Sequence, residues 1–182
     1  MKYSELETPR LLLRGWRETD VDDFFAYCSH PKVGPAAGWA PHEDKGTSRN
    51  IMWKFMEAGD VWALVDRQSR RVIGSVGLHE DKRRDNPNCR MLGYALSAEY
   101  WGQGIMTEAA QAVLRYAFET LSLEMVTVYH YSSNSRSQRV IEKCGFRCEG
   151  TLRRGTVRFD GQVLDIVCYS LLREEYEQLR RR

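Results

Sequence analysis

The segment between residues 91 and 120 restricts the fold of this chain more than any other. Apolar residues over 91–97 predict a strand, and the turn Gly102-Gln103-Gly104 follows it within a few residues. Apolar side chains then recur at helical spacing over 107–120, with charged residues on the opposite face. Glycines let the backbone approach an anion, and the free amides of a helix's first turn bind phosphate groups. This pattern alone predicts a phosphate-binding turn or, about equally, a tight turn without a ligand.

Short strand and helix patterns flank this segment on both sides. Thr19 and Asp22 form a capping-box pattern before the first helix, and Gly145 suits a left-handed helix cap. Residues 32–41, rich in Gly and Pro, are expected to form a loop that acts as a lid. The order β-α-α-β-β-β-α-β-α-β-β predicts a mixed α/β sheet rather than a doubly wound one. Besides 91–97 and 107–120, strands are predicted at 10–16, 61–66, 72–79, 124–131, 146–152 and 163–172, and helices at 21–29, 43–58, 135–144 and 173–182.

Length and charge narrow the class of protein. The 182 residues suit a single domain over 1–182. No apolar run approaches the roughly 20 residues of a membrane span, and the N-terminus has acidic residues where a secretion signal has an apolar core. We therefore expect no membrane association and a cytoplasmic location. The 27 Lys and Arg against 25 Asp and Glu are too balanced for a dedicated nucleic-acid binder.

The cysteines predict reduced thiols and no metal. Five of them are scattered along the chain without a Cys-x-x-Cys pair, as in a cytosolic protein. Cys144 and Cys148 are the closest pair, but no nearby His completes a zinc site. We expect both to be buried structural residues, and we expect no metal site.

A second motif lies one predicted strand after the glycine turn, Asn134-x-x-Ser137 followed by Glu142-Lys143-x-Gly145-Phe146. Together with Trp101-Gly-Gln-Gly-Ile-Met-Thr-Glu-Ala109, it resembles the GNAT acetyltransferases, in particular the ribosomal-protein N-acetyltransferase branch of RimJ/RimL type. Thr8-Pro-Arg-Leu-Leu-Leu-Arg14, Glu149-Gly-Thr-Leu-Arg153 and Tyr169-Ser-Leu-Leu-Arg-Glu-Glu-Tyr176 fit the same branch in the expected order. The resemblance implies a single-domain GNAT fold, with a mixed, mostly antiparallel central sheet that is splayed at an acetyl-CoA site and flanked by helices.

The same resemblance implies which residues contact acetyl-CoA. Backbone amides of the turn surround the pyrophosphate, Asn134 bonds the pantetheine arm, and Ser137 lies near the sulfur. The family pattern in the turn is Gln/Arg-x-x-Gly-x-Gly/Ala, from which this chain departs with Trp101 and Met106. Local capping chemistry alone favours Asn134 as an ordinary helix N-cap, with Ser137 at its third position, over a ligand role. The implied cofactor-binding residues are Leu96, Trp101, Gly102, Gln103, Gly104, Ile105, Met106, Thr107, Asn134 and Ser137.

Amide formation from a thioester needs a neutral amine, a stabilised oxyanion and a leaving thiolate. Many GNAT enzymes assist the thiolate with a Tyr at the position of Ile141, so we assign that role to Ser137 and carbonyl polarisation to the Leu96 backbone amide. No general base stands out, since Glu80 and Glu149 are more simply solvated. An N-terminal α-amine, with a pKa near ~8 against ~10.4 for Lys, needs less help and is mildly favoured.

Three residues, Trp39, Pro41 and His42, are candidates for the acceptor pocket, with simple packing as the alternative. The expected function is transfer of an acetyl group from acetyl-CoA to a primary amine, for example the N-terminus of a ribosomal protein. The alternatives are a small-molecule amine (a drug, a polyamine or an aminoacyl compound) and a non-catalytic acyl-CoA-binding module. Beyond acetyl-CoA and the acceptor we expect no direct nucleic-acid partner, and both a monomer and a homodimer remain open.

Overall fold

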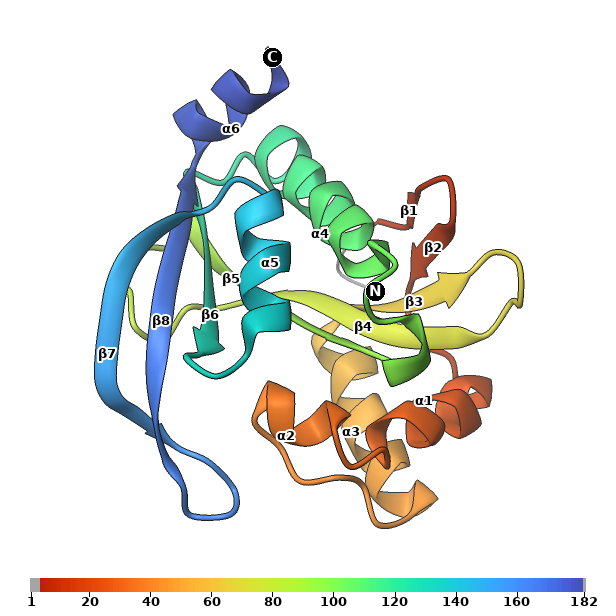
Figure 1. The fold of residues 1–182 in the computed structure, drawn as a ribbon. Coiled ribbons are helices and arrows are strands. Elements are labelled where there is room, and N and C mark those ends of the chain that lie inside the picture. The colour runs from red at the N-terminus through yellow and green to blue at the C-terminus, as the bar shows by residue number, and fades with distance from the viewer. Residues whose placement is uncertain (1–3, 182) are drawn as a thin grey trace.

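The computed structural model describes residues 4–181 and contains an eight-stranded sheet in the order β1-β2-β3-β4-β5-β6-β8-β7 (Figure 1). All neighbouring strands are antiparallel except β5 and β6, which are parallel. The expectation of a mixed, mostly antiparallel α/β sheet is confirmed. The strands are β1 (Leu6–Glu7), β2 (Leu11–Arg14), β3 (Val61–Asp66), β4 (Val72–His79), β5 (Cys89–Leu96), β6 (Met125–Tyr131), β7 (Arg147–Val157) and β8 (Val163–Leu172).

Helices cover both faces of this sheet (Figure 1). One large apolar cluster joins the sheet to α4 and α5, and a second joins β3 and β4 to α1 and α3. Within residues 4–181, no helix has both the length and the hydropathy of a membrane span. Arg182, the last residue of the predicted C-terminal helix, lies outside the described residues. The helices are α1 (Val21–Cys28), α2 (Val33–Ala37), α3 (Lys45–Ala58), α4 (Ile105–Arg115), α5 (Ser135–Lys143) and α6 (Arg173–Arg180).

The segment predicted as a loop over 32–41 contains a helix, α2. Pro35 lies in its first turn, where a missing N–H costs little, and Gly38 ends it with φ +103°. Val33 is buried against the core, so tertiary packing stabilises a helix too short to be stable alone.

The capping box predicted at Thr19 and Asp22 is wrong. The chain forms a 3₁₀ turn over Glu18–Asp20 before α1, and the buried Asp20 carboxylate accepts both Arg14 guanidinium nitrogens, at 2.7 and 2.8 Å, and the Arg17 backbone N–H at 2.8 Å. A buried, bidentate ion pair is stronger than a local capping bond, and it fixes where α1 begins.

Other differences concern element ends and one cysteine. The predicted helix over 107–120 begins earlier, at Ile105, and its last part is a π-helical turn over Tyr116–Thr120. Strand β7 runs on past Leu152 because it pairs with β8 along a long hairpin with two register shifts. Cys148 is exposed rather than buried, because it lies on this outer strand. Gly145 has φ +84°, as predicted, and Leu179 fills the space where a Cβ would lie.

Candidate active site

The parallel strands β5 and β6 separate partway along the sheet. They pair only from Cys89–Met125 to Met91–Thr127, although β5 continues to Leu96. The Ser97 N–H bonds the Ile73 carbonyl of β4 at 2.8 Å. Because backbone groups alternate between the two edges of a strand, the Leu96 N–H and C=O face the gap.

A cavity of about 260 Å³ lies at this gap. It is bordered by the end of β5, the turn before α4 and the first turn of α4, one side of α5, and α2. Of the sequence-predicted cofactor residues, all but Gln103 line it. The lining residues are Val33, Ala36, Ala37, Tyr94, Ala95, Leu96, Tyr100, Trp101, Gly102, Gly104, Ile105, Met106, Thr107, Asn134, Arg136, Ser137, Arg139, Val140 and Lys143.

The turn before α4 opens backbone amides toward a ligand. Gly102 and Gly104 have φ values of +77° and +75°, which other residues rarely adopt. Gly104 is the N-cap of α4, and no side chain caps this helix. The first bond of α4 runs from the Glu108 N–H to the Gly104 carbonyl, so the amides from Gly104 to Thr107 precede any intrahelical partner. Such amides, at the positive end of the helix dipole, suit an anion.

The charged side chains that line the cavity are all basic. Arg136, Arg139 and Lys143 line it, and no Asp or Glu is among the described lining residues. The Arg136 guanidinium lies 4.1 Å from the centre of the Trp101 ring, and the Trp101 Nε1–H donates to the Leu96 carbonyl at 2.9 Å. The cavity therefore suits an anionic ligand, and Trp101 ties the turn to the end of β5.

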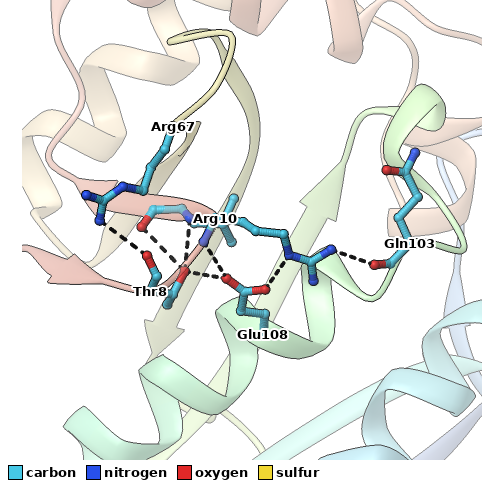
Figure 2. A network of polar contacts seen from close by, with 6 residues as sticks. Thr8, Arg10, Arg67, Gln103 and Glu108 are labelled. Atoms are coloured by element: carbon cyan, nitrogen blue, oxygen red, sulfur yellow. Dashed lines mark hydrogen bonds and ion pairs between the residues drawn. The ribbon is translucent and has the colours of Figure 1, made fainter.

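An external network holds the turn (Figure 2). The Glu108 carboxylate accepts the Thr8 hydroxyl and the Arg10 Nε–H, both at 2.6 Å, and Arg10 Nη1 donates to the Gln103 carbonyl at 2.9 Å. Burial alone would raise the pKa of the Glu108 carboxyl, but the bonds from Thr8 and Arg10 outweigh it and hold the pKa below its ordinary value. The carboxylate is thus ionised at neutral pH.

The reaction candidate Ser137 has a partner that the sequence did not indicate, Tyr94 of β5. The two hydroxyl oxygens lie 2.8 Å apart, and both residues line the cavity. Burial raises the pKa of the Tyr94 hydroxyl, although the Ser137 bond acts in the opposite direction. A signal did exist, since Tyr94 and Leu96 lie two apart on one strand and share a face.

Both polar atoms of the Asn134 side-chain amide form hydrogen bonds with other groups of the protein. Its Oδ1 accepts the Ser137 N–H at 3.1 Å, which makes Asn134 the N-cap of α5, and its Nδ2–H donates to the Ala36 carbonyl of α2 at 3.0 Å. The residue lines the cavity, but its polar atoms are already bonded to protein groups.

The predicted acceptor residues do not line this cavity. The His42 side chain is buried, with Nδ1 2.7 Å from the Ser48 hydroxyl, and Trp39 packs against it. Pro41 lies between them in the chain and is half-buried. Burial lowers the pKa of His42. These contacts give the segment a packing role, while a role in acceptor binding stays a prediction.

Two carboxylates considered as bases also lie elsewhere. Glu80 is exposed, and Glu149 is paired with Arg84. Among the described residues, no group of three or more His, Cys, Asp and Glu side chains is placed to hold a metal ion.

Comparisons with known proteins give the family. Residues 10–147 match the family described as "Acetyltransferase (GNAT) domain". The chain is 28% identical over 177 residues to "Uncharacterized N-acetyltransferase p20" of Bacillus licheniformis, covering 94% of this chain and 97% of that protein. It is 26% identical over 179 residues to "[Ribosomal protein uS5]-alanine N-acetyltransferase" of Escherichia coli, covering 91% and 89%.

The fold is shared with solved structures as well. A GNAT-family acetyltransferase from Bacillus anthracis superposes with a TM-score of 0.86 at 24% identity, over 94% of this chain and 99% of that one. Because the family match spans most of the chain and the glycine turn, the splayed strands and α5 meet at one cavity, this chain belongs to the GNAT family of N-acetyltransferases.

Proposed function

We propose that this acetyltransferase transfers the acetyl group of acetyl-CoA to a primary amine, with the N-terminal α-amine of a protein as the favoured acceptor. One observation carries the proposal: open amides at the start of α4, the free edge of β5 and the Ser137 hydroxyl border a single cavity with cationic walls. A phosphate-rich donor with an amide-containing arm matches these three features together.

Different residues of the cavity bind different parts of the donor. The amides from Gly104 to Thr107 hold the pyrophosphate, and Lys143 adds positive charge to the same cavity. The edge of β5 at Leu96, which faces the gap left by β6, receives the donor as a neighbouring strand would; the Leu96 N–H is the group offered to it, because the Leu96 carbonyl already accepts the Trp101 Nε1–H. Asn134 supports the arm indirectly, because it caps α5 and thereby places Ser137.

Acetyl-CoA supplies a thioester, in which the bond to sulfur breaks as the amide C–N bond forms and the amine loses one proton. The Leu96 N–H donates to the carbonyl oxygen as negative charge develops on it. The Ser137 hydroxyl donates a hydrogen bond to the departing sulfur. Tyr94 keeps its own proton at neutral pH and orients the Ser137 oxygen through the 2.8 Å contact.

The residues that line the cavity indicate which class of amine is the acceptor. The described lining residues include no carboxylate and no His, so the amine loses its proton to water. An α-amine, with a pKa near ~8, is neutral in roughly a tenth to a fifth of molecules at physiological pH, whereas a Lys amine, with a pKa near ~10.4, is neutral in roughly a thousandth. The relative named for ribosomal protein uS5 alanine supports the same class of acceptor and the RimJ/RimL branch. A small-molecule amine is the second candidate, because the α2 segment borders the cavity and can differ in shape between relatives.

The remaining parts of the proposal concern the cellular compartment and the oligomeric state. Five free cysteines suit a reducing compartment, and we place the enzyme in the cytoplasm as a monomer or homodimer.

Calorimetric titration with acetyl-CoA, followed by free-thiol release against N-terminal peptides and small amines, tests the function. Binding together with peptide-dependent thiol release supports it, and release with small amines alone supports the second candidate. Binding without release on any amine would favour a non-catalytic acyl-CoA-binding protein. Absence of binding would refute the donor site.

A further inference from the structure

The Gln103–Gly104 peptide group is held from outside the cavity. Arg10 Nη1 donates to the Gln103 carbonyl at 2.9 Å, and this peptide, like every other described one, is not cis (Figure 2). In a trans peptide the C=O and the following N–H point in opposite directions. A carbonyl held toward Arg10 therefore turns the Gly104 N–H to the other side of the turn. Gly104 lines the cavity, whereas Gln103 and Arg10 do not.

We propose that Arg10 is a positioning residue for donor binding, which aims the Gly104 N–H at the pyrophosphate. The inference rests on the proposed donor site and adds a residue from the β1–β2 turn, about a hundred positions from α4 in sequence. Arg10 is not among the residues that line the donor cavity; it lines a neighbouring hollow with Gly104, Thr107 and Lys143, and its proposed action is through the peptide group.

Arg10 is itself rigidly placed. Its backbone N–H donates to Glu108 at 3.0 Å, and its carbonyl accepts the Arg67 N–H at 2.9 Å. The neighbouring Leu11 N–H bonds the Thr8 hydroxyl, which in turn donates to Glu108. The guanidinium thus joins residues 103 and 108, one on each side of the first turn of α4. The turn cannot rotate its peptide groups without breaking this link.

Arg10 also neutralises an unfavourable charge. Glu108 lies in the first turn of α4 and is ionised, so alone it would repel an anion bound at the same helix end. The ion pair with Arg10, at 2.6 Å, offsets that repulsion. Removal of Arg10 therefore weakens donor binding in two ways, through peptide orientation and through charge.

The test compares two ligands in Arg10→Ala. CoA carries the pyrophosphate and pantetheine lacks it, so only the CoA dissociation constant should rise, about 10-fold, when both are titrated and followed by NMR. Arg10→Lys keeps the charge but not the fork of donors and should fall between wild type and Arg10→Ala. Arg147→Ala, which loses an exposed ion pair with Glu175 at 2.9 Å and lies outside the network of Figure 2, is the matched control and should leave both constants unchanged.

Each other outcome overturns a specific statement. An unchanged CoA constant in Arg10→Ala, or an equal loss for CoA and pantetheine, refutes the positioning role, because a general loss of structure does not distinguish the two ligands. If Arg10→Ala fails to fold, the ratio of constants in Arg10→Lys decides in the same way. Failure of the wild-type protein to bind CoA refutes the proposed function instead.

Discussion

The two ends of the cavity are built differently. At the α4 end, positions are set by backbone geometry, with two left-handed glycines and a helix start, and Arg10 and Glu108 hold them from outside. At the α2 end, a five-residue helix depends on long-range bonds to its last carbonyls, from Asn134 to Ala36 at 3.0 Å and from Arg158 to Pro35 at 3.4 Å. In the proposed function the α4 end binds a donor that acetyltransferases share, whereas the α2 end borders the place of the acceptor. The α4 end should therefore be intolerant of substitution, and the α2 end should adjust.

The largest effect is expected from Gly104→Asp. An Asp there must adopt φ near +75°, and it adds a negative charge beside Arg10, whose Nη2 lies 3.7 Å from the position of the new Cβ, at the helix start proposed to hold the pyrophosphate. We expect the acetyl-CoA dissociation constant to rise about 1,000-fold, which is ~4 kcal/mol, as measured by calorimetry. Gly161→Asp is the control, because Gly161 has φ +81° and open space around it in the β7–β8 turn. Equal losses in both variants would mean that backbone strain, and not the anion site, causes the effect.

Ser137→Ala comes next and acts on rate alone. Loss of a single hydrogen-bond donor to a developing charge typically lowers turnover about 100-fold. We expect that decrease in thiol-release turnover with a nearly unchanged acetyl-CoA dissociation constant. Ser135→Ala, on the exposed side of the same helix, should behave as wild type. Full turnover in Ser137→Ala would remove Ser137 from the mechanism.

Tyr94→Phe should lower turnover about 5-fold, since one buried hydrogen bond contributes ~1 kcal/mol. Because Tyr94 acts through Ser137, the double variant should be no slower than Ser137→Ala alone. Additive losses would show that the hydroxyls act separately. Tyr100→Phe, at another tyrosine of the cavity wall, is the control.

The raised pKa of Tyr94 gives a pH prediction. The folded protein retains this proton above pH 10, where an unfolded tyrosine loses it. The stabilisation from the shift is therefore fully present below about pH 10 and lost at higher pH. Urea unfolding at pH 9 and pH 11 should show a smaller loss of stability with pH in Tyr94→Phe than in wild type. An equal loss would argue against the shift.

The smallest effect is expected from Asn134→Ser, which distinguishes the two ends directly. A Ser keeps an N-cap acceptor for the Ser137 N–H but loses the donor to the Ala36 carbonyl, and it adds no charge to the cavity. We expect the acceptor KM to rise about 3-fold, with the acetyl-CoA dissociation constant within error of wild type. An increase in the acetyl-CoA constant instead would assign the side chain to the pantetheine arm.

The contrast between the ends also explains what the sequence could predict. The glycine turn, the helix after it and the bounds of β3, β4 and β8 follow from local patterns, and the structure confirms them. Helix α2 has no such pattern and forms because Val33 is buried by distant parts of the chain. The Tyr94–Ser137 and Arg10–Gln103 bonds join residues 43 and 93 positions apart. A single sequence does not indicate which distant residues will form such bonds. The one available indication was that Tyr94 and Leu96 lie on the same face of a strand.

The short β5–β6 pairing has a mechanical consequence. The β5–β6 ladder, where the half-sheet β1–β5 meets the half-sheet β6–β8, contains three residue pairs, while other strand pairs in the interior of the sheet are longer. A donor bound in this gap, as proposed, would contact both halves and stabilise the folded protein. At a donor concentration 100 times the dissociation constant this stabilisation is about 2.7 kcal/mol. The supply of donor would then set the stability of the fold along with the reaction rate.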